Sequence, residues 1–381
     1  MRVGINLLHL STHEAGVACY ARSLVRALLA SEGVDAFILY GRKRHIEHFR
    51  RANVQLRSVR FLPDNRWFRI LWEQLAMGGA IRVRGPDVFH WPDYSRSLLA
   101  PGARSVVTVH DLAFLRLNHI YDQGRTLYKR LMAKVSVSGA RAIIAVSENT
   151  ARDITELLGI PRARINPIPN GIDSDFRQLP PHVCEEYRKR RLGGIGPFIL
   201  FVGTVEPRKN VMRLLEAHEI MQKMGIKGIP LVLAGRQGWK SEQIVKAIQK
   251  GMAKGSVCWL GYVPREELPI LYNLCRIFVY PSLYEGFGFP PLEAMACGAP
   301  VITSDNSSLS EVTGDAALLI DPLDAEALAG AMARLIEDHA LRDSMHSRGI
   351  EHAGKYRWEE TARRTIEVYR KVNCCESGDY S

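Results

Sequence analysis

The chain has 381 residues, of which 46% are hydrophobic, and its formal net charge is +11. This length exceeds what one hydrophobic core usually organises, so we expect two domains of about 180 residues each. The seven cysteines include no C-x-x-C pair, which argues against a zinc site and favours a reducing compartment. No apolar run reaches the length of a membrane span, and Asn6 and His9 come too early for a signal peptide. We therefore expect a cytoplasmic protein that is neither secreted nor integral to a membrane.

The positive charge is concentrated in the first half of the chain. Residues 1–185 hold 26 Lys and Arg against 16 Asp and Glu, whereas residues 186–381 hold 25 against 24. The segment from Gly41 to Arg84 alone has eleven basic and three acidic residues, interleaved with Phe and Trp. Its stretch RWFRILWEQLAM, residues 66–77, predicts a helix that either docks on an anionic membrane surface or faces the core. We expect no nucleic-acid partner, because the usual motifs and repeats are absent.

Strand and helix signals alternate along the chain. This alternation restarts after the charged, proline-containing segment Arg177 to Pro197. It predicts an α/β protein whose parallel sheets are covered on both faces. We place two domains at residues 1–180 and 195–355, followed by a last helix within residues 356–381. The expected strands are VGINLL, FILY, VFHW, SVVTVH and AIIAVS in the first domain, and FILFVG, PLVLAG, VCWLG, IFVYPS, APVIT and ALLID in the second.

The strand FILFVG leads into GTVEPRKN, residues 203–210, which carries the adjacent cations Arg208 and Lys209. They come where a helix is expected to begin and to point its free N–H groups outwards. Cations at a helix N-terminus oppose the helix dipole, so two merely solvated basic residues are the weaker interpretation. Fixed cations together with helix N–H groups suit a diphosphate.

Residues 277–304, IFVYPSLYEGFGFPPLEAMACGAPVITS, predict the order strand, loop, helix, strand. Glu285 lies in the loop, and Glu293, with seven residues between them, is expected in the first turn of the helix. In open parallel sheets, ligands bind where such loops leave the carboxyl ends of the strands. The plain alternative is a solvated loop acid and a glutamate that complements the helix dipole.

This segment resembles, almost residue for residue, the glutamate-x7-glutamate signature of retaining GT-B glycosyltransferases that use nucleotide sugars (glycosyltransferase family 4, group 1). The resemblance implies that Glu285 and the backbone of Gly286, Phe287 and Gly288 hold the donor sugar. It also implies that Glu293 binds the ribose hydroxyls. Short motifs alone have a high false-positive rate, but the matching string here is long.

The same resemblance gives Arg208 and Lys209 the role of a pyrophosphate clamp beside Gly203. The chain departs from the family pattern at Thr204, where many relatives have an arginine directly after the glycine. The division of labour between the two cations is therefore open, although their joint role in donor binding is implied.

Two further positions, Gly16 and His110, match the family. Gly16 matches a glycine loop that approaches the donor phosphates, although relatives commonly have paired glycines and Ala15 precedes it here. His9 and His13 have no obvious third ligand, so we expect surface histidines and no metal site. His110, at the end of SVVTVH, matches a residue that lies beside the donor sugar and positions it or the acceptor.

Two more groups match family strings, the first implied to bind the nucleotide base and the second to shape the cleft. Gly261, Tyr262 and Val263 match the place where relatives grip the nucleotide base, largely through backbone groups. Asn170 and Gly171 match a family string, and we expect them at a tight turn that needs positive φ.

The resemblance implies a GT-B fold, in which two Rossmann-like domains face an interdomain cleft and the last helix crosses back to the first domain. The first domain is expected to bind the acceptor and the second the sugar nucleotide. The implied reaction moves a hexose from a nucleoside-diphosphate sugar to a glycan or lipid-linked acceptor, with retention of configuration and without a metal or other cofactor. The residues expected to act in catalysis are His110, Arg208, Lys209 and Glu285.

The motifs are most similar to those of bacterial mannosyltransferases of polysaccharide assembly. GDP-mannose is therefore the first donor to test, on an enzyme expected in the cytoplasm or peripherally on the inner face of the membrane. A nucleotide-sugar epimerase, a hydrolase and a catalytically inactive sugar-nucleotide-binding partner remain alternatives.

Overall fold

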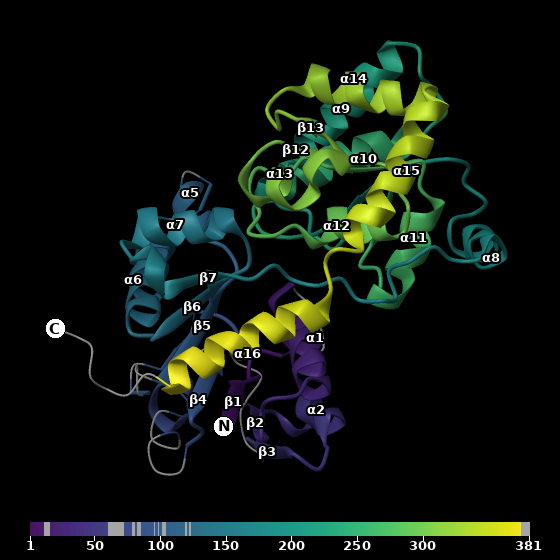
Figure 1. The fold of residues 1–381 in the computed structure, drawn as a ribbon. Coiled ribbons are helices and arrows are strands. Elements are labelled where there is room, and N and C mark those ends of the chain that lie inside the picture. The colour runs from purple at the N-terminus through teal and green to yellow at the C-terminus, as the bar shows by residue number, and fades with distance from the viewer. Residues whose placement is uncertain are drawn as a thin grey trace. The chain divides into compact units, whose positions relative to one another are not determined.

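The computed structural model describes residues 1–10, 16–59, 72–77, 81, 85–94, 96, 97, 99, 100, 104–118, 120, 121 and 123–374. The chain divides into two compact units (Figure 1). The first is Met1–Gly171 together with Arg357–Ser381, and the second is Ile172–Tyr356. No helix in the described ranges is long and apolar enough to cross a membrane.

The first unit is built on a seven-stranded parallel sheet in the order β3-β2-β1-β4-β5-β6-β7. The inner strands β1, β4, β5 and β6 are almost entirely buried, because helices cover both faces of a parallel sheet. All five strands predicted for this unit are present. The strands are β1 Arg2–Asn6, β2 Ala36–Gly41, β3 Val54–Ser58, β4 Val88–Trp91, β5 Ser105–Val109, β6 Ala142–Ala145 and β7 Ile165–Pro167.

The helices of the first unit start and stop at recognisable signals. Ser147 caps α7 by accepting a hydrogen bond from the Thr150 N–H, and Gly159 ends it in the left-handed conformation. The helices are α1 Gly16–Ala30, α2 Lys43–Ile46, α5 Ala113–Arg116, α6 Gln123–Ser138, α7 Glu148–Leu158 and α16 Trp358–Cys374, with the short η1 Glu47–Phe49, η2 Glu73–Met77 and η4 Arg162–Arg164.

The last helix, α16, belongs to the first unit and packs against α1 (Figure 1). Its Tyr369 is fully buried and shares a hydrogen bond of 2.6 Å with Nδ1 of His90 on β4. The other ring nitrogen of His90 lies 2.8 Å from Oγ1 of Thr108 on β5, and the Tyr20 hydroxyl of α1 lies 3.1 Å from the same oxygen. This chain of neutral groups ties both helices to the sheet.

The expectation of positive φ at Asn170 and Gly171 is wrong, because neither residue has it. Gly171 is needed for a different reason. A Cβ at this position would lie 2.2 Å from the backbone nitrogen of Trp358, the first residue of α16. Only glycine permits this close approach of two backbone segments.

The second unit is built on a six-stranded parallel sheet in the order β10-β9-β8-β11-β12-β13. All six predicted strands are present. The strands are β8 Ile199–Val202, β9 Leu231–Ala234, β10 Val257–Gly261, β11 Ile277–Tyr280, β12 Val301–Ser304 and β13 Ala317–Ile320. The helices are α8 Pro181–Arg191, α9 Val211–Lys223, α10 Glu242–Ala253, α11 Leu268–Leu274, α12 Phe289–Ala296, α13 Ser307–Thr313, α14 Ala325–Glu337 and α15 His339–Ala353, with η5 Pro207–Lys209, η6 Arg265–Glu267 and η7 Gly314–Ala316.

This strand order is that of the doubly wound dinucleotide-binding fold. In this fold, successive strands are added first towards one edge of the sheet and then, from the centre, towards the other edge. Here the two central strands on either side of this change are β8 and β11, which pair in parallel. Ligands in such sheets bind outside the carboxyl ends of the two strands. The loops that follow β8 and β11 are therefore where topology alone places a ligand site.

The basic, aromatic segment Gly41–Arg84 is only partly described, and residues 60–71, 78–80 and 82–84 lie outside the described ranges. Of the predicted helix 66–77, the described part begins at Trp72. Trp72 packs against the hydrophobic core of the first unit, and Met77 is fully buried in that core. These two side chains face inwards.

Candidate functional site

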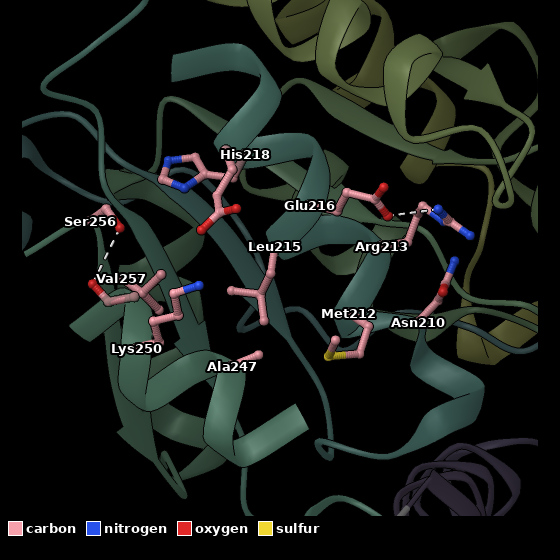
Figure 2. Close-up of a pocket in the computed structure, with 12 residues that line it drawn as sticks. Asn210, Met212, Arg213, Leu215, Glu216, His218, Ala247, Lys250, Ser256 and Val257 are labelled. Carbon is pink, nitrogen blue, oxygen red and sulfur yellow. Dashed lines mark hydrogen bonds and ion pairs between the residues drawn. The ribbon is translucent and has the colours of Figure 1, made fainter. Parts of the chain in front are cut away.

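The second unit has a pocket of about 380 Å³ beside α9 and α10 (Figure 2). Its charged side chains include an ion pair, with Arg213 and Glu216 at 2.6 Å. The described residues that line the pocket include none of those named above for donor binding. The loops after β8 and β11 are a better candidate site, because they bring unlike charges together in the interior.

The loop after β8 holds Arg208 and Lys209 in a single helical turn, η5, directly before α9. Asn210 separates the two elements in the left-handed conformation, with φ of 58°. Its side-chain amide donates to the carbonyl of Pro322 at 2.6 Å, which fixes this turn. The predicted order of strand, cationic loop and helix is thus present.

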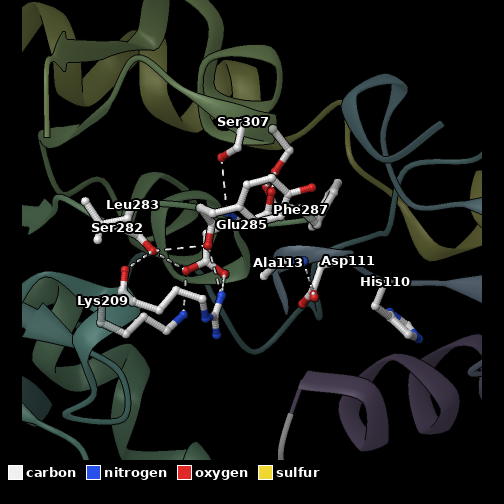
Figure 3. Close-up of polar contacts among 12 residues, drawn as sticks. His110, Asp111, Ala113, Lys209, Ser282, Leu283, Glu285, Phe287 and Ser307 are labelled. Atoms are coloured by element: carbon white, nitrogen blue, oxygen red, sulfur yellow. Dashed lines mark hydrogen bonds and ion pairs between the residues drawn. The ribbon is translucent and has the colours of Figure 1, made fainter. Parts of the chain in front are cut away.

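Both cations contact the same carboxylate (Figure 3). Lys209 Nζ lies 2.6 Å from Oε1 of Glu285, and Arg208 Nη1 lies 2.8 Å from Oε2. Ser282 and Tyr280 also donate their hydroxyls to Oε1, at 2.6 and 3.1 Å. Glu285 and Lys209 are each only 8% exposed, so this is a buried cluster and the plain interpretation of Glu285 as a solvated loop acid is wrong.

Backbone contacts brace the two loops against each other. The carbonyl of Arg208 accepts hydrogen bonds from the Leu283 N–H at 2.9 Å and from the Ser282 hydroxyl at 3.2 Å. On the other side, the Glu285 N–H donates to Ser307 Oγ at 3.1 Å, and Ser308 donates to the Glu285 carbonyl at 2.9 Å. The carboxylate is therefore held in position from both directions.

The electrostatics of the cluster favour an ionised Glu285. Burial would raise the pKa of this carboxyl, but the charges of Arg208 and Lys209 and the hydrogen bonds from Lys209 and Ser282 outweigh it and lower the pKa to about 2. Burial and the neighbouring Arg208 lower the pKa of Lys209, and Glu285 opposes that shift. The carboxylate can accept hydrogen bonds at neutral pH but holds no proton to donate.

Glu293 does not lie in the first turn of its helix, where the sequence analysis expects it. The helix α12 begins at Phe289, so Glu293 is in its second turn. The start is earlier because Pro290 and Pro291 fit the first turn of a helix, where backbone N–H groups lack helical partners. Gly288 precedes it with φ of +103°, a conformation that glycine adopts readily.

The Glu293 carboxylate is buried and paired. Arg265 donates to its Oε1 at 3.0 Å, and the Tyr272 hydroxyl donates to its Oε2 at 3.2 Å. Burial raises the pKa of Glu293, and Arg265 opposes the rise. Arg265 also pairs with Asp173 at 3.0 Å and lies over the ring of Phe176.

The other predicted donor residues of the second unit lie at the ends of neighbouring strands. Gly203 and Thr204 follow β8 directly, and Gly261, with φ of +66°, ends β10. The carbonyl of Gly261 accepts from the N–H of Gly235 after β9, at 2.7 Å. Tyr262 is 54% exposed, so its ring is accessible to a ligand.

The loop after β11 holds the remaining predicted residues. Phe287 is buried, and Ser308 donates to its carbonyl at 3.0 Å. Gly286 lies between Phe287 and Glu285, while Val263 follows Tyr262 in the turn before η6.

In the first unit, His110 directly follows β5, as predicted. Its Nε2 lies 2.7 Å from the carbonyl of Pro92, and its ring meets that of Tyr20 edge-on at 4.7 Å. Burial lowers the pKa of His110. Gly16 is the first residue of α1, and the rest of its loop, residues 11–15, lies outside the described ranges.

Among the residues that the structure describes, no group of three or more His, Cys, Asp or Glu side chains is arranged to hold a metal ion. The sequence does contain the Asp-x-Asp string at Asp173 to Asp175, but Asp173 is engaged by Arg265.

Several residues of the site were not predicted from the sequence. Tyr280 and Ser282 complete the shell of Glu285, and Arg265 and Tyr272 complete that of Glu293. Tyr280 and Ser282 lie at the end of β11, next to the motif, so their position was a usable signal. Arg265 and Tyr272 carried no such signal, because they come from η6 and α11.

Family models match nearly the whole chain. Residues 15–176 match the family described as Glycosyltransferase Family 4, and residues 185–352 match Glycosyl transferases group 1. The two matches fall on the first and the second unit, respectively.

Two curated relatives are mannosyltransferases of Escherichia coli. The chain is 36% identical over 292 residues to O-antigen chain mannosyltransferase B, covering 76% of both proteins. It is 29% identical over 321 residues to the serotype-specific mannosyltransferase WbdA, covering 78% of this chain but only 38% of that longer protein.

Solved structures of similar fold cover almost the entire chain. Sucrose-phosphate synthase of Thermosynechococcus elongatus aligns with a TM-score of 0.77 and 21% identity, over 97% of this chain and 98% of the other. HepE of Anabaena, solved in complex with UDP-glucose, aligns with a TM-score of 0.74 and 16% identity, over 97% and 100%. The α/β fold class of GT-B type predicted from the sequence is confirmed.

Proposed function

Because the chain belongs to the glycosyltransferases of family 4 and group 1, we propose that it transfers a hexose, with mannose as the first choice, from a nucleoside-diphosphate sugar. The acceptor is a glycan or a lipid-linked glycan of a bacterial polysaccharide, and the sugar keeps its anomeric configuration. One observation carries the proposal: the cluster of Arg208, Lys209 and Glu285 at the carboxyl ends of β8 and β11. The relatives named as mannosyltransferases support the choice of sugar.

The donor diphosphate would take over the cations of this cluster. Arg208 and Lys209 now neutralise Glu285, and a diphosphate carries more negative charge and more acceptor oxygens than a carboxylate. When the cations turn to the phosphates, the Glu285 carboxylate becomes available to the hydroxyls of the donor sugar. Before the donor binds, the two cations hold the pKa of Glu285 low, so the carboxylate enters this acceptor role already ionised.

Catalysis would then rest mainly on charge stabilisation. As the glycosidic bond breaks, negative charge grows on the diphosphate, and Arg208 and Lys209 meet that charge in a water-poor site. The acceptor hydroxyl attacks from the face that the diphosphate leaves, and a phosphate oxygen takes its proton. Side chains supply the neutralising charge, so the proposed reaction uses no metal or other cofactor.

Recognition of the nucleoside would involve the neighbouring strand ends. Glu293 is proposed to bind the ribose, with Arg265 and Tyr272 fixing its carboxylate, and Gly261 to Val263 to contact the base. GDP-mannose is the first donor to test. His110, at the end of β5, and Gly16, at the start of α1, are proposed to serve the donor or the acceptor from the first unit.

A panel of sugar nucleotides tests the proposal. Thermal shift with UDP-, GDP-, ADP- and dTDP-sugars should identify one stabilising donor, and turnover of that donor should release its nucleoside diphosphate only when an acceptor extract is present. Release without acceptor would indicate a hydrolase, interconversion of sugars an epimerase, and binding without turnover an inactive partner. Activity should survive EDTA, and a loss that added metal reverses would contradict the metal-independent reaction.

A further inference from the structure

Helix α6 of the first unit leaves large apolar side chains in solvent. Leu127, Leu131 and Val135 are 70%, 61% and 39% exposed. They are spaced by four residues, so they form one continuous ridge along the helix. Apolar side chains exposed singly are ordinary on a protein surface, but three in one row form an unpartnered face.

A basic ridge runs beside the apolar one. Arg130 and Lys134 are exposed and are also four residues apart. At about 100° per residue, the exposed positions from Leu127 to Ser138 span an arc of about 140° around the helix. On the opposite side, the described side chains of Ala133, Ser136 and Val137 are buried, and the sequence of α6 contains no Asp or Glu. The exposed face is therefore apolar on one flank and cationic on the other.

The positive charge continues past the end of the helix. Arg164 donates a hydrogen bond of 2.7 Å to the carbonyl of Ser138, the last residue of α6. Arg164 also lines a pocket of about 320 Å³ together with Arg141 and Lys371, and none of the described residues that line it is acidic. Cations therefore lie both along α6 and beside its C-terminal end.

An anionic lipid bilayer fits this face better than a second copy of the chain. In an interfacial helix, apolar side chains enter the boundary of the headgroups while Lys and Arg contact anionic lipid. A symmetric pair of chains would instead bring two identical basic ridges together, which is electrostatically unfavourable.

We propose that the first unit docks on an anionic lipid bilayer through the exposed face of α6, formed by Leu127, Arg130, Leu131, Lys134 and Val135. This surface does not include the segment Gly41–Arg84, for which the sequence analysis predicts either membrane docking or a core-facing helix. The proposal is independent of the sugar donor, and it would bring the enzyme to the surface that holds a lipid-linked acceptor.

Flotation of the full chain with vesicles tests the proposal. Binding to vesicles of phosphatidylethanolamine and phosphatidylglycerol should exceed binding to phosphatidylcholine and should fall as salt rises, because surface charges are screened. The double variant Arg130→Gln/Lys134→Gln should lower the partition coefficient by about thirtyfold. Leu127→Asp/Leu131→Asp should lower it by about tenfold or more.

The matched control is Met212→Asp/Leu323→Asp, which changes two exposed apolar side chains of the second unit and should leave vesicle binding unchanged. Absence of binding by the unmodified chain, or equal binding by the α6 variants, would overturn the proposal. So would a drop in oligomeric mass, measured by light scattering, in the α6 variants alone. Should the aspartate variant fail to fold, the Arg130→Gln/Lys134→Gln pair carries the test.

Discussion

In both parallel sheets, the order of the strands changes direction next to the first strand of the unit. The two units nevertheless place different polar groups near this point. In the first unit, His90, Thr108, Tyr20 and Tyr369 form a buried chain of hydrogen bonds. Burial, with a smaller effect of nearby His110 and His9, lowers the pKa of His90 to about 3, so the ring is neutral near pH 7. The first network carries no charge.

In the second unit, the loops after β8 and β11 hold the buried pair Lys209 and Glu285 together with the partly buried Arg208, which also pairs with Glu206 at 3.1 Å. Burying charges costs desolvation energy, and replacing a buried ion pair by neutral side chains of similar volume is often neutral or stabilising. A buried neutral chain whose members all have partners stabilises the fold that it spans. The first network therefore holds helices to the sheet, whereas the charges of the second are consistent with the proposed binding of a charged ligand.

The largest effect is expected when both cations of the charged network are removed. Arg208→Ala/Lys209→Ala should lower kcat/KM by about a hundredfold or more, or about 2.7 kcal/mol of transition-state stabilisation. Steady-state release of the nucleoside diphosphate measures this. The control Arg213→Ala, in the first turn of α9, removes a surface ion pair and should keep activity near normal. Near-normal turnover of the double variant would refute the clamp.

Substitutions of Glu285 and of Glu293 should impair the enzyme in different ways. Glu285→Gln should lower kcat by about tenfold to a hundredfold while nucleoside diphosphate affinity stays the same or tightens, because the cations lose a competing carboxylate. Glu293→Gln should instead weaken the nucleoside diphosphate itself, since the ribose is present in ground and transition states alike. Calorimetric titration that gives the opposite pattern would reverse the two roles.

A smaller effect is expected from the neutral network. Tyr369→Phe removes the hydroxyl that pairs with His90, and the buried ring nitrogen loses its partner, so the free energy of unfolding should fall by about 1–3 kcal/mol. Tyr356→Phe is the matched control, because its half-buried hydroxyl donates to the Val312 carbonyl and should cost about 1 kcal/mol or less. Urea unfolding measures both, and equal losses would argue against a special role for the network.

The pH dependence of the free energy of unfolding tests whether the His90 ring is neutral in the folded state. The pKa of His90 lies below its ordinary value of 6.5, so the unfolded chain binds more protons as pH falls from there towards 3. The folded state should lose up to about 1.4 kcal/mol per pH unit through this window because of His90. Burial also lowers the pKa of His110 and His218, so the readout is the difference between the unmodified chain and His90→Gln. A variant with an unchanged slope would show that His90 is protonated without cost.

Much of the fold could be predicted because buried parallel strands are apolar along their whole length. All eleven predicted strands are present, while β3 and β7 were missed. β3 lies at a sheet edge, and at least half of its residues are exposed. β7 has only three residues and ends at Pro167. Neither strand therefore shows a long apolar run. Edge strands lack the two covered faces that produce such a signal.

Site residues could be predicted where they belong to one sequence motif. Contacts between residues far apart in the sequence could not. Glu285 was placed in its loop correctly, but its pairing with Arg208 and Lys209 requires β8 and β11 to be neighbours, which no local pattern specifies. The exposed ridge of α6 was not predicted either. Leucines at helical spacing usually face a core, and only the packed structure shows Leu131 in solvent.

One quadruple variant, Glu206→Gln/Arg208→Met/Lys209→Met/Glu285→Gln, tests most directly whether the charged network serves a ligand at the expense of stability. Glu206 is included because its carboxylate pairs with Arg208 at 3.1 Å. The variant removes these four charges while nearly preserving volume. The free energy of unfolding should match or exceed that of the unmodified chain to within about 1 kcal/mol. Calorimetry should at the same time show no binding of the nucleoside diphosphate. A variant that unfolds about 3 kcal/mol more easily, or that still binds the nucleotide as the unmodified chain does, would contradict the account.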